Sequence, residues 1–370
     1  MSEPTTAAPQ SWRESASAAL APWVVSRFVV LGAIAVAVEV SRTVGARPLG
    51  FVNDGLFAWD AAYYRDIAEG GYHAVELAGL RFFPLLPMLG WLVGVGVRAN
   101  WGVVIVANLA AFAAMALVHR VVLDETRNGS VARRAVWFFA LFPAAAVLVL
   151  PYSEGLLVCA AALFLLGVRR RIWWLAMVAG VAAGLARPTG LLLVVPALVA
   201  WWRVRHDRRA WLPAAGAAFA PIAGVGAFLT YSAVAFGDFW RPLQLQSAKN
   251  LRGGVVDPFT RLARGVGDLF GDRVGSGLHV LWAGVVVALL VVMIRRLPAE
   301  YSWWAGVSVV VALSADNLDS FERYCLVVFP FAWVLATLAR REWSERAVLG
   351  VWGAGLVAYT VLGVFQISIP

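Results

Sequence analysis

Charged residues are scarce in this chain, and lysine is almost absent. Only 14% of the 370 residues are charged and 61% are hydrophobic, whereas a soluble domain carries about 25% charged and about 45–50% apolar residues. No soluble fold of this length could bury so much apolar surface, so the composition predicts a membrane protein and not two or three soluble domains. Lys249 is the single lysine, and the net charge of +9 comes almost entirely from arginine.

Cysteine and histidine, which supply many metal sites, are also rare. The two cysteines, Cys159 and Cys325, fall in or at the edge of apolar segments, which argues against a disulfide framework or a metal centre. The four histidines are scattered, so neither a metal nor a cofactor is expected. The sequence has no G-x-x-x-x-G-K-[ST] and no strand-led G-x-G-x-x-G, which leaves nucleotide binding without support. The arginine clusters are short and lie between apolar runs, so nucleic acid is not an expected partner.

Long apolar segments fill the chain after a polar N-terminus. Residues 1–21 are too polar for the core of a signal peptide, and we expect a disordered cytoplasmic tail before one transmembrane domain of residues 22–370. A spanning helix needs about 20 mostly apolar residues. The candidate segments are Pro22–Val40, Trp101–Val118, Ala135–Leu150, Glu154–Val168, Ile172–Ala186, Thr189–Trp202, Trp211–Phe236, Leu278–Ile294, Tyr301–Leu313, Cys325–Leu338 and Ala347–Phe365.

The arginine clusters predict how these segments cross the membrane, because short basic loops stay in the cytoplasm. The clusters lie at residues 120–134, 169–171, 203–209, 295–296 and 340–346. If all of them are inside, the helices alternate cleanly, with the N-terminus inside and the C-terminus outside. Two long loops, at about residues 42–100 and 237–277, are then both outside.

One further apolar stretch, Phe82–Val97, does not fit this alternation as a span. It contains Pro84 and Pro87, and we expect a juxtamembrane or re-entrant helix that lies beside the first outer loop. The prediction is therefore about eleven spans. Twelve spans with one misplaced segment is the alternative.

The first outer loop combines acids and aromatic rings beside the predicted membrane surface. One helix face would carry four of its residues, at the spacing i, i+3, i+4, i+7: Asp60, Tyr63, Tyr64 and Ile67. Aromatic rings can stack on a sugar and a carboxylate can accept a hydroxyl proton, so Asp60, which follows Trp59, is a candidate general base. Asp66 is a second candidate. An interfacial aromatic belt with Asp60 as a helix cap accounts for the same residues equally well.

Three further motifs place polar residues at the predicted outer ends of apolar segments. Ser153 and Glu154 suit a helix start, but a carboxylate at bilayer depth is costly and often functional. Arg187, in a very tight turn, breaks the positive-inside pattern; it suits binding of a lipid phosphate, and snorkelling to headgroups is the alternative. Arg323 offers a second outer guanidinium, unless it only balances the charge of Glu322 beside it.

Taken in order, these motifs resemble those of the PIG-V family of mannosyltransferases, within the GT-C superfamily of polytopic glycosyltransferases. The resemblance extends over most of the chain and rests on Trp59-Asp60 with Tyr64, Ile67-Ala68 and Gly71-Tyr72, Phe82-Phe83-Pro84-Leu85 with Pro87, Pro151-Tyr152-Ser153-Glu154, Arg187-Pro188-Thr189-Gly190, and Arg323-Tyr324 with Phe329-Pro330.

The chain departs from the family pattern in two places. Pro188-Thr189 stands at the family's small-residue or Asn position in the turn after Arg187. The outer loop at Gly237–Arg252 matches the family's aromatic-and-arginine segment only loosely, and Lys249 and Arg252 are its candidate cations. These departures affect the predicted acceptor-binding region.

Together with the count of about eleven spans, the resemblance implies an all-α polytopic membrane protein, a GT-C-type bundle with juxtamembrane helices in the first outer loop. It implies a catalytic Asp or Glu in that loop, a polyprenyl-phosphate sugar as donor and co-substrate, and mannose as the sugar. A bacterial member would not make the glycosylphosphatidylinositol anchor, so we expect another lipid-linked or cell-envelope acceptor. Membrane lipids are the remaining expected partners.

The expected reaction is an inverting, metal-independent transfer on the extracytoplasmic face of the plasma membrane. Asp60 is the expected catalytic base, with Asp66 and Glu154 as reserves, while Arg187 with Arg323 or Arg252 would stabilise the leaving phosphate. The substrate-binding candidates are Trp59, Tyr63, Tyr64, Asp66, Glu154, Arg187, Arg252, Arg323 and Tyr324.

Two other classes of protein fit the composition. A transporter or flippase of a lipid-linked sugar would place polar sites at mid-bilayer, often with internal repeats. The sequence shows no convincing repeat, and its acids cluster in the predicted outer loops. A structural membrane partner without chemistry is the third possibility.

Overall fold

The computed structural model describes residues 12–44, 55–96, 98–248, 252–271 and 274–365. These residues form helices and no strands, apart from one isolated bridge between Val255 and Ala315. The α-helices are α1 (Trp12–Val44), α3 (Asp60–Gly70), α4 (Leu85–Gly94), α5 (Ala99–Thr126), α6 (Gly129–Ala140), α7 (Glu154–Arg169), α8 (Trp173–Ala186), α9 (Val194–Arg203), α10 (Arg208–Phe236), α11 (Arg241–Gln244), α12 (Pro258–Leu269), α13 (Val274–Arg296), α14 (Ala299–Leu313), α15 (Phe321–Val327), α16 (Pro330–Leu338) and α17 (Glu342–Val364). Short 3-10 helices are η1 (Gly55–Phe57), η2 (Tyr72–Ala74), η3 (Leu77–Arg81), η4 (Ala145–Leu148), η5 (Pro188–Leu193) and η6 (Leu245–Ser247).

Several of these helices are long and apolar enough to cross a membrane, so the all-helical membrane class is confirmed. Five helices of the described chain, α1, α5, α10, α13 and α17, meet this criterion, and a sixth span results if α15 and α16 count as one helix bent by 81°. Other apolar helices are shorter, such as α8 and the combined segment Pro188–Arg203. The count of about eleven spans therefore stays a prediction.

Two predicted segments differ from the observed helices. Helix α1 begins at Trp12, so the predicted disorder does not extend to residues 12–21, and residues 1–11 lie outside the described part. The segment Ala135–Leu150 is not one helix, because α6 ends at Ala140 and η4 follows. Pro143 lies in that break, where it lacks a backbone N–H and disfavours helix in the residue before it.

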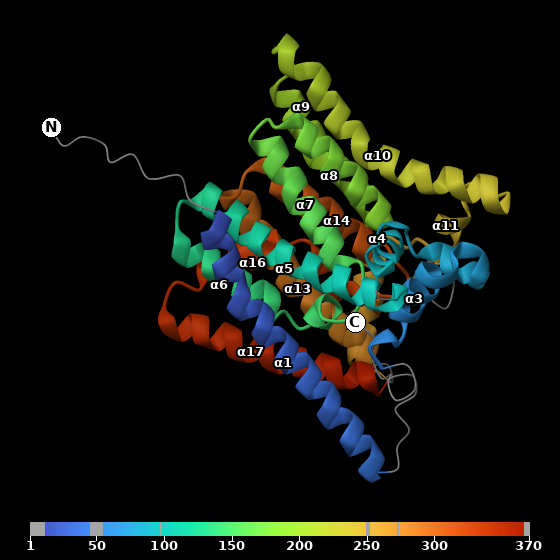
Figure 1. The fold of residues 1–370 in the computed structure, drawn as a ribbon. Helices are drawn as coiled ribbons and strands as arrows, with labels where there is room; N and C mark the ends of the chain where they lie inside the picture. Colours follow the sequence, from blue (N-terminus) through green and yellow to red (C-terminus); the bar gives the residue numbers. More distant parts are fainter. Residues whose placement is uncertain (1–11, 45–54, 97, 249–251, 272–273, 366–370) are drawn as a thin grey trace.

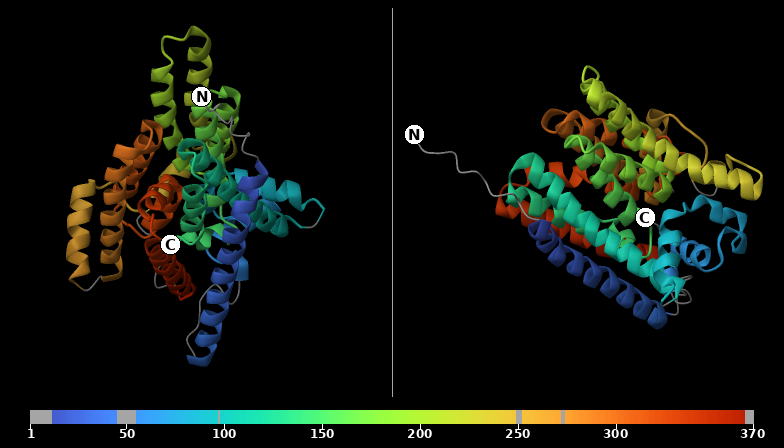
Figure 2. Two further views of the ribbon diagram at one scale, coloured as in Figure 1. Left: turned by 90° about the vertical axis from the view of Figure 1, so that its left-hand side faces the viewer. Right: turned by 45° about the horizontal axis from the view of Figure 1, so that its top comes forward.

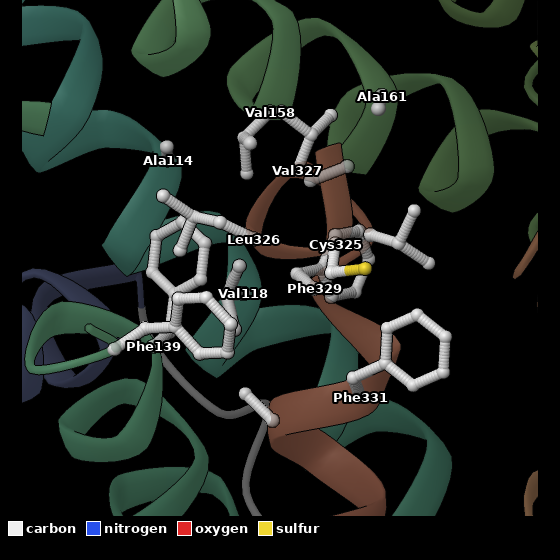
Figure 3. Packing of buried hydrophobic residues seen from close by; sticks show 14 of the residues in the cluster. Ala114, Val118, Phe139, Val158, Ala161, Cys325, Leu326, Val327, Phe329 and Phe331 are labelled. Carbon is white, nitrogen blue, oxygen red and sulfur yellow. The ribbon is translucent and has the colours of Figure 1, made fainter. Parts of the chain in front are cut away.

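Small residues allow the helices of the bundle to pack closely. Helices α5, α7, α8 and α10 form successive neighbours, with α1 and α6 also against α5. Figure 3 shows the bent pair α15–α16 with Leu326 and Phe329 among Val118 of α5, Phe139 of α6 and Val158 of α7. Buried alanines on these faces let the backbones approach closely, as is usual where membrane helices associate.

A smaller lobe made of α3, α4, η2 and η3 covers the N-terminal end of α5 and the C-terminal half of α10, at the right of Figure 1. Helix α4 has only ten residues, about 15 Å, too short to cross a membrane. It presses against α5, because a Cβ atom on Gly102 would lie 1.9 Å from the carbonyl oxygen of Gly90. The structure thus agrees with the prediction that Phe82–Val97 does not span, although Val97 itself lies outside the described residues.

Candidate functional site

A polar cavity of about 450 Å³ lies where the lobe meets the bundle. Its wall is formed by the start of α3, the segment after η3, the turn before η5, α11 with η6, the end of α14 and the loop that enters α15. Seven of the ten predicted site residues line it: Trp59, Asp60, Tyr64, Arg187, Arg252, Arg323 and Tyr324. Segments far apart in the sequence therefore converge on one cavity.

Asp60 is the first residue of α3, and its carboxylate is partly accessible. The side chain is 29% exposed, and Arg323 Nη2 lies 3.0 Å from its Oδ2 atom. Trp59 is the N-cap residue and makes no capping hydrogen bond through its side chain. The alternative interpretation of Asp60 as the helix cap is therefore wrong, and its carboxylate is directed to an arginine of the cavity.

Trp59 has an unusual backbone conformation immediately before this acid. Its φ of 57° places a large non-glycine residue in the left-handed region, a conformation that costs about 1–3 kcal/mol and persists only where the surroundings enforce it. The turn at Trp59 directs the chain into α3, so that both Trp59 and Asp60 line the cavity.

Glu154 lies beneath the cavity and holds two of its arginines. Its side chain is 1% exposed, and its Oε1 atom accepts hydrogen bonds from Arg187 Nη1 at 2.5 Å and from Arg323 Nε. Glu154 does not line the cavity itself, so its role as a reserve base is not supported. Buried charges are tolerated only when they are paired, and the chain Asp60–Arg323–Glu154–Arg187 meets that requirement with two charges of each sign.

Arg252 and Arg81 add positive charge to the cavity that no described carboxylate neutralises. Arg252 lies 4.7 Å above the ring of Tyr324 and donates to the carbonyl oxygen of Val311 at 3.1 Å. Arg81 donates to a backbone carbonyl and its guanidinium lies 5.0 Å from the Phe82 ring. These two guanidinium groups are available to an anionic ligand, whereas Arg187 and Arg323 are already engaged by carboxylates. Lys249, the other cation considered in this loop, lies outside the described residues.

Tyr64 connects the aromatic face of α3 to the ion-pair chain. Its hydroxyl lies 2.7 Å from Ser153 Oγ, which also accepts a hydrogen bond from Arg187. Burial raises the pKa of Tyr64 to about 12, so the phenol stays protonated at neutral pH. Tyr64 is therefore suited to fix the position of Ser153 and Arg187 and not to act as a base.

Two predicted residues of the first loop lie outside the cavity. Tyr63 stacks on Phe82, with ring centroids 4.6 Å apart, and Asp66 forms an ion pair with Arg65 at 2.7 Å. Neither residue lines the cavity. Of the three acids that were candidate bases, Asp60 is the one with access to it.

Sequence reasoning missed several cavity residues, including a second acid. Asp319 lines the cavity and accepts a hydrogen bond from Asn317 at 2.9 Å. The interaction with His279, whose Nε2 lies 3.7 Å from Oδ1, lowers the pKa of Asp319, which keeps it ionised. Gln246 also lines the cavity and donates to the carbonyl oxygen of Arg81 at 2.8 Å. No local pattern marks these residues, because loop contacts between distant segments bring them to the site.

Glu322 and Arg323, adjacent in sequence, have different partners. Glu322 is 1% exposed; its Oε1 lies 2.8 Å from His279 Nδ1, and Tyr359 donates to the same oxygen at 3.3 Å. Arg323 instead pairs with Glu154 and Asp60. The interpretation of Glu322 and Arg323 as a local charge balance is therefore wrong. Within the described residues, no group of three or more His, Cys, Asp or Glu side chains is arranged to hold a metal ion.

The fold and the cavity together define a helical membrane protein with a polar, arginine-rich site at one end of its bundle. No protein-family model matches the chain. No curated protein matches it either.

Proposed function

We propose that this chain is a glycosyltransferase that moves a sugar from a polyprenyl-phosphate donor to a hydroxyl group of a lipid-linked or cell-envelope acceptor. The observation that carries the proposal is the convergence of Asp60 with four arginines in one cavity at the edge of an apolar bundle. A carboxylate is the group needed to accept a hydroxyl proton, and guanidinium groups are the donors best suited to a phosphate. The resemblance of the motifs to the PIG-V family adds mannose as the sugar and the extracytoplasmic face as the location.

In the proposed reaction, Asp60 removes the proton of the acceptor hydroxyl as that oxygen attacks the anomeric carbon. The attack comes from the face opposite the phosphate, so the configuration inverts while the bond between carbon and phosphate oxygen breaks. The electron pair of that bond leaves with the prenyl phosphate, and the proton stays on Asp60. Because the leaving group is already a stable anion, no separate acid is required.

Arg252 and Arg81 are the proposed phosphate ligands. They carry the positive charge of the cavity that carboxylates leave free, and a guanidinium can bind phosphate through two parallel hydrogen bonds. Arg323 then orients the Asp60 carboxylate, and Glu154 positions Arg323 and Arg187. Charge neutralisation by arginine makes the proposed reaction independent of metal ions.

A small apolar cavity beside the polar one supports a prenyl-phosphate donor. It shares Arg252, Thr189 and Tyr324 with the polar cavity, and continues between α7, η5 and α14 along Leu193 and Trp304. A phosphate held by Arg252 would therefore have an apolar path beside it for a lipid chain. The cavity holds only about 20 Å³, so these side chains would have to move apart to admit the chain.

The test is transfer of radiolabelled mannose from polyprenyl-phosphate mannose to membrane lipids or envelope material, in the presence of EDTA. Asp60→Asn should lower the rate about 100-fold or more, the usual contribution of a general base. Asp66→Asn is the matched control, because Asp66 lies on the same helix outside the cavity. Near wild-type transfer by Asp60→Asn, or transfer that stops with EDTA, would contradict the mechanism; a chain that moves the donor across vesicles without transfer would be a flippase.

A further inference from the structure

A second open cavity, of about 600 Å³, lies at the other end of α5 and α14. Helix α14 reaches the polar cavity at Ala312 and begins beside the second cavity at Pro298, while α5 starts beside the lobe and ends there at Glu125 and Thr126. The two cavities are therefore at opposite ends of the bundle. The arginine pattern of the sequence predicts that the second cavity faces the cytoplasm.

Three arginines converge on this cavity without an acidic partner. Arg295 and Arg296 end α13, and Arg340 follows α16. All three are exposed, and none forms an ion pair with any residue of the described chain. The one acid in the cavity wall, Glu125, is held by two hydrogen bonds from Arg169. The concave surface thus keeps a local excess of positive charge.

Three nearby arginines at the same end of the bundle do have acidic partners. Arg134 pairs with Glu345 at 2.8 Å, and Arg203 and Arg169 both pair with Glu300. Arg208 and Arg209, in the predicted cytoplasmic turn at the start of α10, also have no ion pair in the described chain, but they do not line the cavity. Among these arginines, only those of the cavity bring three guanidinium groups without a described carboxylate partner onto one concave surface, and this arrangement suits an external anion.

The cavity wall also offers an interfacial aromatic residue. Trp333 lines the cavity and is 3% exposed, and its indole Nε1 has no hydrogen-bond partner among the described residues. The Tyr301 ring packs on it edge to face at 5.1 Å, and the Tyr301 hydroxyl donates to Glu125. An aromatic side chain beside arginines is typical of the headgroup level of a membrane, where one side is apolar and the other is polar.

We propose that this cavity binds a phosphoryl group, carried by the headgroup of an anionic phospholipid or by free phosphate. Basic pockets between transmembrane helices on the cytoplasmic side suit anionic headgroups, and several guanidinium groups around one concave surface match phosphate oxygens. The site is separate from the polar cavity and does not depend on the proposed transfer reaction.

The experiment measures phospholipid binding to the full-length protein in neutral detergent by native mass spectrometry. Phosphatidylglycerol and phosphatidylcholine are titrated against wild type and against the double variant Arg295→Gln/Arg296→Gln. The matched control is Arg208→Gln/Arg209→Gln, which removes two exposed arginines from another predicted cytoplasmic turn. Phosphatidylglycerol should bind wild type and the control alike, and the cavity variant at least about fivefold more weakly, as expected for loss of even one basic contact.

Two further arms make the result decisive. Arg340→Glu changes a different segment of the cavity and should lose the same binding, which guards against a folding defect in one variant. In the third arm, inorganic phosphate replaces lipid, and a rise in melting temperature seen in wild type but not in the cavity variants would show that the site takes free phosphate. Equal losses in cavity and control variants, equal binding of phosphatidylcholine, or no binding of either phosphate source would overturn the proposal.

Discussion

Each end of the bundle contains a buried glutamate that is paired with two arginines, but the surroundings of the two clusters differ. At one end the buried Glu154 receives Arg187 and Arg323, and at the other the buried Glu300 receives Arg169 and Arg203. In both carboxylates one oxygen takes the arginines, and the second oxygen has no hydrogen-bond partner in the described chain.

The two ends differ in the second carboxylate that the shared arginine contacts. Arg323 continues from Glu154 to Asp60 and lines the polar cavity, whereas Arg169 continues from Glu300 to Glu125, to which Tyr301 also donates. The first arrangement ends on an accessible carboxylate, while the second ends on Glu125, which Arg169 and Tyr301 already engage. A buried ion pair between helices is therefore weak evidence for a site by itself. The accessible acid at its end makes the first arrangement a candidate for catalysis.

The largest effect that separates the two ends is expected from removing each glutamate charge. Glu154→Gln and Glu300→Gln should both destabilise the protein, by about 3 kcal/mol for Glu154, because breaking a buried pair leaves uncompensated charge. The loss at Glu300 should be smaller, since Arg169 and Arg203 are 28% and 47% exposed and water can solvate them. Thermal melting in detergent measures both, and transfer per folded molecule should fall only for Glu154→Gln. Equal transfer by the two variants would remove the distinction between the ends.

An intermediate effect is expected from Arg252, the cavity arginine without a described carboxylate partner. Arg252→Gln should raise the KM for the prenyl-phosphate donor and lower kcat/KM by about tenfold to 100-fold, the usual effect of losing a hydrogen bond to a charged group. Arg264→Gln is the control, since Arg264 is exposed, pairs with Asp316 and lies outside the cavity. Steady-state kinetics with varied donor give the answer, and an unchanged KM would exclude Arg252 as a phosphate ligand.

The smallest effect is expected at the second acid of the polar cavity. The interaction with His279, whose Nε2 lies 3.7 Å from Oδ1, lowers the pKa of Asp319 below its usual 3.8. A carboxyl group whose pKa is lower in the folded state than in the unfolded state stabilises the fold at any pH above its unfolded pKa. This contribution is lost as the pH falls through the folded pKa. Asp319→Asn should therefore lower the melting temperature at pH 7 and barely change it near pH 3. The effect should stay under about 1 kcal/mol, because the side chain is 65% exposed. A difference that grows toward low pH would reverse this assignment.

Sequence reasoning could predict the helical membrane class and the convergence of Asp60, Arg187 and Arg323. The length of the apolar runs indicates membrane helices, and the arginine-rich loops between them predict the topology. Polar residues at the predicted outer ends of these helices must then lie near the same membrane face. The breaks in the helices were harder to predict, although Pro143 and Pro330 mark two of them.

The pairing of His279 with Glu322, and the arrival of Asp319 and Gln246 in the cavity, could not be predicted. His279 and Glu322 are 43 residues apart on different helices, so neither helical spacing nor charge pattern connects them. The role of Glu154 was also open, because a residue at a helix start can cap it, act as a base or bind arginines. Only its burial and its two guanidinium partners distinguish these roles.

The bend between α15 and α16 determines where Arg323 lies relative to the axis of α16. One straight helix from Phe321 to Leu338 would be about 27 Å long, and Arg323 would lie near its tip, in line with the axis of α16. The 81° bend instead turns α15 across the bundle, which allows a residue only seven positions before Pro330 to reach both Glu154 and Asp60. A change of the angle at this joint would move the Arg323 guanidinium, so the position of the Asp60 partner depends on a corner, Val328 and Phe329, that does not line the polar cavity.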